Sequence, residues 1–193
     1  MILSKSDLQY YLDEDAKQCG KPLRPTLKQR FVNWLFPDYN YEFQRCLRKL
    51  EYYTNCRTIG GGCKRLIYNK LHEKLRHKTG IELNINVAGP GLHISHGKVV
   101  VSSIAKLGEH CKLLSDVTIG GQGRYDRHGA PTLGNRVFVG SGAKIIGDIT
   151  IADDVVIGAN AVVTRSITEP GTTWAGNPAK KVSDNGSERY LNR

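Results

Sequence analysis

Histidine side chains are the groups in this sequence that are best suited to moving protons near neutral pH, and the 193 residues contain six of them. His96 follows the glycine-rich stretch 89–91, and His128 lies in a polar stretch. A histidine held beside a hydroxyl group can remove its proton as a general base. Three other histidines stand in a basic segment or at a variable repeat position, and we expect them to face solvent: His72, His77 and His110.

A six-residue period organises the sequence around these histidines from residue 81 onward. One column of large aliphatic residues contains Val101, Leu107, Leu113, Ile119, Leu133, Val139, Ile145, Ile151, Ile157 and Val163. A second column contains Val87, Val99, Ala105, Cys111, Val117, Val137, Ala143, Ile149, Val155 and Ala161. This period fits neither an α-helix nor a simple strand, and it predicts a mainly β solenoid with three hexads in each triangular coil. His93 falls in the second column, so we expect a packed or interfacial histidine there.

One insertion interrupts the repeat. Ile119 and Leu133 are 14 residues apart where the period requires 6, which leaves 8 residues for a loop within 121–131. This loop is polar and contains His128. Loops carried on a rigid scaffold often hold functional residues, so we expect function here.

Residues 1–80 have the pattern of helices. Apolar residues recur at helical spacing near residues 8–19 and 43–53, and a short helix is expected over 27–36. The glycines at 60–62 predict a hinge or loop, and Gly80 is expected to end a last basic helix. On this last helix we expect four residues to point inward: Leu66, Ile67, Leu71 and Leu75.

Charge is concentrated in the same N-terminal part. Residues 1–80 contain 16 Lys and Arg against 8 Asp and Glu, whereas residues 81–193 contain 12 against 10. A basic surface attracts nucleic acid, anionic membranes or acidic polymers, although a solvated helical surface also accounts for it. The 5 cysteines form no CxxC pair and are expected to be reduced. No apolar run is long enough for export or for a membrane span, so a cytoplasmic location is expected.

The repeat half resembles the hexapeptide-repeat acyltransferases, in particular the serine acetyltransferases and their capsular-polysaccharide relatives. Six segments carry the resemblance: HISHGKVVV (93–101), VTIGG (117–121), DRHGAP (126–131), VGSGAKIIGDITI (139–151), IGANAVV (157–163) and AGNPAKK (175–181). The resemblance implies a left-handed parallel β-helix, a homotrimer with active sites at the subunit interfaces, and acetyl transfer from acetyl-CoA to a hydroxyl. The expected organisation is an α-helical N-terminal segment at 1–80, the β-helix at 81–182 with its loop at 121–131, and a C-terminal tail at 183–193.

The resemblance also assigns catalytic roles. His96 matches the histidine that acts as the base in this family. The family places an acidic residue fifteen positions before that histidine, and Glu82 stands fourteen before His96, so a deletion of one residue would align it as the group that orients the imidazole. His128 matches a loop histidine and is expected to contact the acceptor or to stabilise the transition state.

Backbone amides and lysines are expected to hold the cofactor. The N–H of Gly121 can point into a cleft, while Ser141 and Ala159 match coil positions that bind the pantetheine arm in the family. Lys180 and Lys181 match the basic residues near the nucleotide phosphates, and as point charges they suit that role. A merely basic tail is the alternative, and no metal is expected.

Two departures from the serine acetyltransferases concern the acceptor. Those enzymes have an aspartate directly before the catalytic histidine, and here Ser95 occupies that position. Their loop histidine is followed at once by proline, whereas Gly129 and Ala130 intervene here. The sugar-acetylating relatives have the pattern GPGLxIxH, which matches residues 89–96 better. We therefore expect a sugar hydroxyl in surface-polysaccharide assembly as the acceptor, with L-serine as the alternative.

Three rival interpretations remain open. The γ-carbonic anhydrases share this solenoid and bind zinc through three histidines, and His93 with His96 could begin such a site. A module that binds nucleic acid or an acidic glycan would use the basic half, but no nucleic-acid motif appears. A catalytically inactive scaffold is disfavoured because His96 and Gly121 are present.

Overall fold

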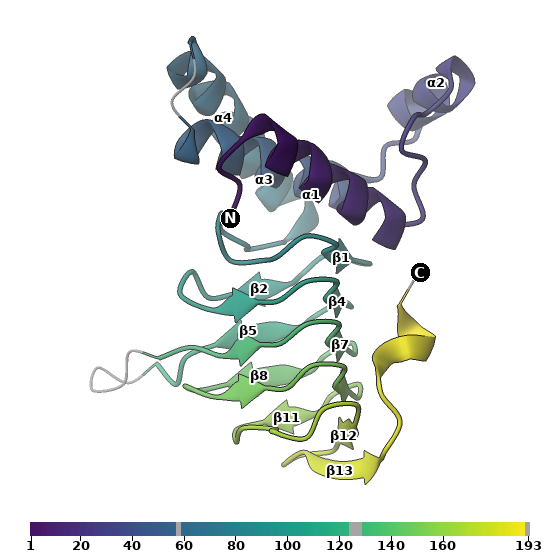
Figure 1. Cartoon of the computed structure of the whole chain (residues 1–193), viewed down its shortest axis with the longest axis vertical. Helices are drawn as coiled ribbons and strands as arrows, with labels where there is room; N and C mark the ends of the chain where they lie inside the picture. The colour runs from purple at the N-terminus through teal and green to yellow at the C-terminus, as the bar shows by residue number, and fades with distance from the viewer. Residues whose placement is uncertain (57–58, 124–128, 192–193) are drawn as a thin grey trace.

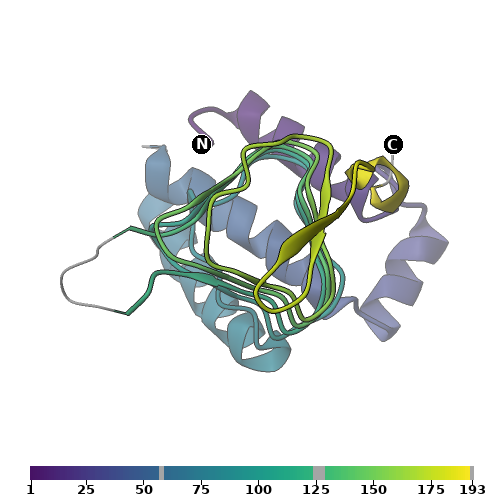
Figure 2. The same cartoon turned by 90° about the horizontal axis from the view of Figure 1, so that it is seen from below.

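The computed structural model describes residues 1–56, 59–123 and 129–191. A β-helix forms the lower part of the molecule, and helices cover its upper end (Figure 1). Viewed along its axis, the β-helix is a triangle with three flat sides (Figure 2). The parallel β-helix predicted from the six-residue period is therefore present.

Each side of the triangle is one sheet of short strands. The first sheet contains β1 (His93–Ile94), β4 (Lys112–Leu113), β7 (Phe138–Val139), β10 (Val156–Ile157), β12 (Thr173–Ala175) and β13 (Lys180–Ser183). The second contains β2 (Val100–Val101), β5 (Thr118–Gly120), β8 (Lys144–Ile146) and β11 (Val162–Val163). The third contains β3 (Lys106–Leu107), β6 (Thr132–Leu133) and β9 (Thr150–Ile151). All strand pairs are parallel except β12 with β13.

The register of the strands measures the inserted loop. Val100 pairs with Thr118, so one coil advances by 18 residues. Thr118 pairs with Lys144, so the next coil advances by 26. The difference of 8 residues is the insertion that the interrupted period predicts, and it lies between β5 of the second sheet and β6 of the third. Residues 124–128 of the loop, which include His128, lie outside the described residues.

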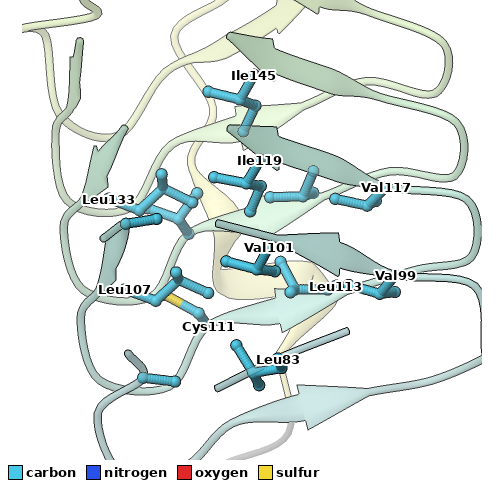
Figure 3. Close-up of a cluster of buried hydrophobic side chains, with 14 of the residues drawn as sticks. Leu83, Val99, Val101, Leu107, Cys111, Leu113, Val117, Ile119, Leu133 and Ile145 are labelled. Atoms are coloured by element: carbon cyan, nitrogen blue, oxygen red, sulfur yellow. The ribbon is translucent and has the colours of Figure 1, made fainter. Parts of the chain in front are cut away.

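The interior of the triangle is filled by the two aliphatic columns. Every column residue from 99 to 163 that the six-residue period predicts is buried (Figure 3). Large side chains such as Leu113, Ile119 and Ile145 are fully enclosed and stack from coil to coil. Each such side chain contributes about 1.5–3 kcal/mol by burial. Repetition of this stacking holds together strands that are only two or three residues long.

Four helices precede the β-helix in the described residues. They are α1 (Lys5–Gln18), α2 (Leu27–Leu35), α3 (Tyr39–Asn55) and α4 (Gly61–Thr79). Ser4 caps α1 by accepting a hydrogen bond from the N–H of Asp7, and Gly80 ends α4 in the left-handed conformation. The predicted glycine hinge is shorter than expected, because only Gly60 stands outside α4, as its N-cap, and residues 61 and 62 are helical.

The buried face of α4 differs from the predicted one. Leu66, Ile67 and Leu71 are exposed, and of the four residues expected to point inward only Leu75 is buried. The face that packs on α3 instead contains Tyr68, which stacks on Tyr53, and His72, which lies 4.9 Å from the Phe43 ring. The expectation that His72 faces solvent is therefore wrong, and burial lowers its pKa.

Helix α3 closes the upper edge of the β-helix by pairing with its first strand. The side-chain amide of Gln44 donates to the carbonyl of Leu92 at 2.8 Å and accepts from the N–H of Ile94 at 2.8 Å. Asn40 donates to the carbonyl of Ser95 at 3.3 Å. These are the bonds that a further strand would make, so the helix satisfies backbone groups that an open edge would leave unpaired.

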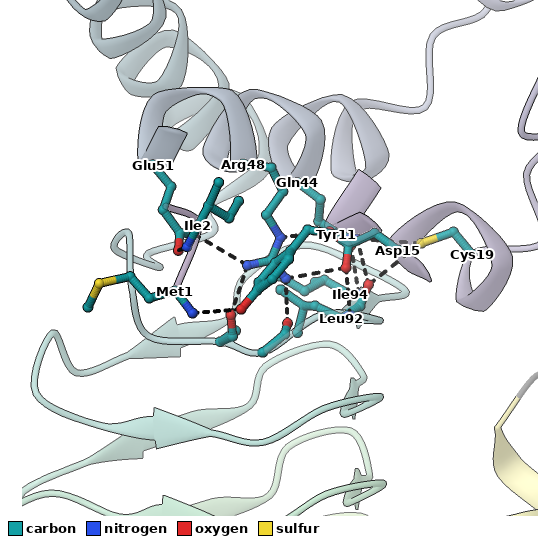
Figure 4. Close-up of polar contacts among 12 residues, drawn as sticks. Met1, Ile2, Tyr11, Asp15, Cys19, Gln44, Arg48, Glu51, Leu92 and Ile94 are labelled. Atoms are coloured by element: carbon teal, nitrogen blue, oxygen red, sulfur yellow. Dashed lines mark hydrogen bonds and ion pairs between the residues drawn. The ribbon is translucent and has the colours of Figure 1, made fainter. Parts of the chain in front are cut away.

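A buried ion pair continues this closure (Figure 4). Arg48 donates to the carboxylate of Asp15 from two nitrogens, at 2.8 and 3.3 Å. The same guanidinium donates to the carbonyls of Ala88 and Gly89, and Asp15 accepts from the N–H of Leu92 at 2.8 Å. Helices α1 and α3 are thereby attached to the turn that leads into β1.

The C-terminal residues return along the first sheet (Figure 1). A short 3-10 helix spans Ser187–Tyr190. The ring of Tyr190 stacks on Phe138 with centroids 4.5 Å apart, and the Lys112 ammonium donates to the Tyr190 carbonyl at 3.0 Å. The tail covers the outer face of this sheet.

Candidate active site

Three of the eight predicted site residues lie along one corner of the triangle, where the first sheet passes into the second. The strand register aligns Ile94, Leu113, Val139, Ile157 and Trp174 in successive coils. The residues two positions further on form a line down this corner: His96, Ser115, Ser141, Ala159 and Gly176. Since adjacent strands are about 4.8 Å apart, the line from His96 to Ala159 spans roughly 14 Å.

His96 occupies a corner that is one residue longer than the one below it. Seven residues lead from His93 to Val100, but six lead from their partners Lys112 to Thr118. Position 97 requires glycine, because a Cβ there would lie 2.0 Å from the Thr79 carbonyl oxygen. The His96 side chain is exposed. The turn therefore presents His96 to solvent, where it can reach a substrate.

Glu82 lies beside the same corner but does not contact His96. Its backbone bridges Val100, its N–H donates to the Val99 carbonyl at 2.7 Å, and its side chain is exposed. Neither the Glu82 carboxylate nor the His96 ring forms a hydrogen bond or ion pair with the described residues. Six residues lead from Glu82 to Ala88, whereas seven lead from Val100 to Leu107, which are their partners in the next coil. The first coil is therefore one residue shorter here, and this is the deletion that aligns Glu82 with the acidic residue of the family.

That omission also explains why His93 does not take the inner-column position that the six-residue period assigns to it, although it is packed as expected. The register shifts by one residue, so Leu92 and Ile94 enter the core and His93 turns outward. His93 remains half-buried, and burial, assisted by the positive charge of Lys112, lowers its pKa to about 4. Its Nε2 lies 3.3 Å from the Ser95 hydroxyl, while its Nδ1 is buried without a partner. His93 is therefore neutral at pH 7.

The lower part of the corner can accommodate an extended ligand against the backbone. A side chain at Gly140 would come within 2.7 Å of the Ala159 nitrogen, so the coils stack closely here. The Ser115 hydroxyl donates to Ser141 at 3.3 Å. Ala159 is exposed and Ser141 half-exposed. Ser115 shares the line without having been predicted, and the 8-residue insertion obscures its alignment with Ser141 in the sequence.

A hollow of about 470 Å³ lies at the lower end of the β-helix and is lined by Arg165, Lys180 and Lys181, among others. Lys181 forms ion pairs with Asp184 and Glu169, and these hydrogen bonds raise its pKa. Lys180 and Arg165 form no ion pair with any residue that the structure describes. Of the two predicted lysines, Lys180 is therefore the one that is available to bind an external anion. Arg165 is a further cation in the same hollow, and the sequence analysis did not identify it.

Gly121 lies at a different corner, directly after β5 of the second sheet. It is six residues beyond Ser115, or roughly 15–20 Å along an extended chain. No described backbone or side-chain group accepts a hydrogen bond from its N–H, so that donor is available. Within one chain the structure therefore does not bring Gly121 to His96.

Two searches of the described residues gave negative results. They contain no group of three His, Cys, Asp or Glu side chains that could hold a metal ion. They also contain no helix long and apolar enough to cross a bilayer.

Comparisons with known proteins agree with this geometry. The family model for the bacterial transferase hexapeptide (six repeats) matches residues 130–165. No curated protein sequence matches the chain. Among solved structures, soybean serine acetyltransferase apoenzyme has a TM-score of 0.69 at 26% identity, over 92% of this chain and 70% of that one.

Structures with bound ligands give similar values. Soybean serine acetyltransferase complexed with serine has a TM-score of 0.70 at 26% identity, over 92% of this chain and 70% of that one. The Neisseria gonorrhoeae enzyme in complex with serine has a TM-score of 0.70 at 23% identity, over 94% and 71%. This last similarity concerns the fold alone.

The repeats, the parallel β-helix and these matches define the chain as a hexapeptide-repeat acyltransferase, with the left-handed winding that this family implies. Within that class it is serine acetyltransferase-like.

Proposed function

We propose that this enzyme transfers the acetyl group of acetyl-CoA to the hydroxyl of L-serine. The observation that carries the proposal is the similarity over 92% of the chain to a serine acetyltransferase complexed with serine. It favours serine over the sugar acceptor expected from the GPGLxIxH pattern.

In the proposed reaction His96 is the base. Its imidazole takes the proton of the serine hydroxyl while that oxygen attacks the thioester carbonyl carbon. A tetrahedral oxyanion forms, and a backbone N–H such as that of Gly121 stabilises it. The intermediate collapses, the carbon–sulfur bond breaks, and the protonated His96 returns the proton to the CoA thiolate. O-Acetylserine and CoA leave.

Acetyl-CoA is proposed to lie along the corner that contains Ser141 and Ala159. Their exposure and close coil packing allow the pantetheine arm to approach the backbone. The nucleotide phosphates would then meet Lys180 and Arg165 at the lower hollow. Because Ser141 and Ala159 continue the line below His96, the thioester would end near the base.

A homotrimer is proposed because one chain alone separates the required groups. His96 and Gly121 lie at different corners of the triangle. A neighbouring copy, related by a three-fold axis, could place its Gly121 corner and the adjoining loop with His128 against the His96 corner. Each site would then use two subunits, and Glu82 would orient His96 only once the acceptor is enclosed.

A sugar hydroxyl is the second candidate, and Ser95 is the observation that favours it. The Ser95 hydroxyl lies 3.3 Å from the His93 ring and offers no negative charge for a substrate ammonium. A charged partner would strengthen such a hydrogen bond.

The two candidates are distinguished by release of free CoA thiol from acetyl-CoA. The purified chain is assayed with L-serine, with nucleotide sugars and with oligosaccharides, and the products are identified by mass. A kcat/KM for L-serine of about 10⁴ M⁻¹s⁻¹ or more supports the serine proposal. Release with a saccharide and not with serine contradicts it.

A further inference from the structure

Helix α2 presents an apolar face that packs on nothing in its own chain. Every residue from 22 to 36 is exposed. Leu27 is 82% exposed, Phe31 62%, Trp34 75% and Leu35 53%. Figure 1 shows α2 set apart from α1 and α3, on the side of the helical half away from α4. An amphipathic helix in this position lacks the partner that would bury its apolar stripe.

The face of α2 that carries Asn33 is the one turned toward the protein. Asn33 lines a hollow of about 610 Å³, together with Arg30 and Trp34 of the same helix and with Glu42 of α3. At 3.6 residues per turn, Leu27, Phe31 and Leu35 lie on the side away from Asn33, and Trp34 lies at the edge between the two sides. We call the side away from Asn33 the α2 apolar face.

Positive charge surrounds the α2 apolar face. Between Asp15 and Asp38 the sequence has five basic residues and no acidic one. Arg24, Lys28 and Arg30 form no ion pair within the described part of the chain. Arg24 and Lys28, which do not line the hollow beneath α2, are thus free to meet an external negative charge.

We propose that α2 binds the surface of an anionic lipid bilayer. The helix would lie in the plane of the interface, with the α2 apolar face among the acyl chains and its cations at the phosphates. Trp34, whose ring is tilted against the Phe31 ring with centroids 6.0 Å apart, lies at the edge of this face and suits the headgroup boundary.

A second copy of the chain fits this face less well. Pairing α2 with its own counterpart would bring Lys28 and Arg30 of both copies together, and like charges at an interface oppose association. A lipid surface supplies both an apolar layer and negative charge.

Cosedimentation of the full chain with vesicles tests the proposal. Vesicles of phosphatidylcholine with about one third phosphatidylglycerol should bind the protein, and pure phosphatidylcholine should bind it far more weakly. Phe31→Asp should reduce binding by roughly tenfold or more, since it removes an apolar side chain that the proposal buries among the acyl chains. Asn33→Asp is the matched control, because it adds the same charge on the opposite face. Lys28→Gln should weaken binding by about fivefold.

Two results would overturn the proposal. One is equal binding by Phe31→Asp and Asn33→Asp, which would assign binding to the rest of the basic surface. The other is the absence of binding to either kind of vesicle. In that case sedimentation velocity of Phe31→Asp gives the alternative, because a lower mass than that of the parent protein would identify the α2 apolar face as a contact between copies of the chain. Near-identical circular dichroism of both variants confirms that each remains folded. A blue shift of tryptophan emission on vesicles, absent in Trp34→Phe, would place α2 itself in the lipid.

Discussion

Asp15 of α1 and Arg48 of α3 form a two-point ion pair at 2.8 and 3.3 Å, with both side chains 1% exposed. Burial raises the pKa of the Asp15 carboxyl, and the guanidinium opposes that shift. The remaining donors and acceptors of the pair bind the backbone at Ala88, Gly89 and Leu92. The pair therefore attaches two helices to the first coil, a few residues before His96.

Breaking this pair should destabilise the whole protein. Asp15→Asn leaves the buried guanidinium only the looser contact with Glu51, at 3.5 Å, as a counter-charge, and breaking a buried ion pair typically costs about 3–5 kcal/mol. For a chain of this size that corresponds to a fall in Tm of roughly 6–20 °C. Arg45→Met on the same helix is the control, because Arg45 is exposed and pairs only loosely with Glu42 at 3.6 Å. Thermal unfolding that shows equal effects for the two variants would refute this account.

Gln44 should be needed for the edge of the first coil. Gln44→Leu leaves the Leu92 carbonyl and the Ile94 N–H unpaired in the interior, at about 1–3 kcal/mol for each group. Because His96 follows this strand, KM and kcat should change as well as stability. Denaturant titration and steady-state kinetics measure the two effects. A variant with unchanged stability would show that the helix does not close the edge through this side chain.

His96→Ala should lower kcat by roughly 10²–10⁴-fold, the range for a positioned general base. The ring is exposed, so the Tm should stay close to that of the parent protein. His77→Ala provides the control, since His77 is also exposed but lies on α4. If the activity of His96→Ala stays within a few-fold of the parent, His96 is not the base.

His93 should make the protein less stable in mild acid. Its pKa is about 4 in the folded chain, against an ordinary value of 6.5. As the pH falls from 6.5 toward 4, the unfolded chain binds this proton first, so stability is lost across that window and is fully present above it. His93→Gln should flatten the loss between pH 6.5 and 4, whereas His77→Gln should leave it unchanged. Urea midpoints measured at several pH values decide the matter.

The sequence predicted the β-helix well because its signal is repeated. Val139, Ile145 and Ile151 each indicate the same position on the inner face of a coil, so a misassignment of one residue does not change the predicted fold. The insertion was measurable for the same reason, as a change of phase between Ile119 and Leu133. The predictions failed where the repeat begins, because a single omitted residue before Ala88 exchanges the places of His93 and Ile94.

The helical half was harder to predict, since an apolar residue there does not reveal its partner. Leu66 and Ile67 have the composition of a core but are exposed on α4. Gln44 and Arg48 act through bonds to backbone groups 48 and 40 positions away, which no local pattern encodes. The alignment of His96, Ser141 and Ala159 on one corner follows from the repeat, whereas the place of Arg165 beside Lys180 depends on the hollow that both line and no repeat position indicates it.

The last prediction concerns Ser95, the residue directly before the proposed base. In the proposed reaction the substrate ammonium approaches the corner of His96, and the Ser95 hydroxyl there has no charge to offer. Ser95→Asp should raise kcat/KM for L-serine by roughly 10–150-fold, because a charge-assisted hydrogen bond contributes about 1.5–3 kcal/mol. Ser95→Asn has nearly the same shape without the charge, so its kcat/KM should remain near that of the parent. The gain should appear mainly in KM and should diminish at high salt, which screens charge. Steady-state kinetics at two ionic strengths measure both effects. If Ser95→Asp leaves the serine reaction unchanged and lowers activity with a saccharide, the acceptor is the sugar and the serine proposal fails.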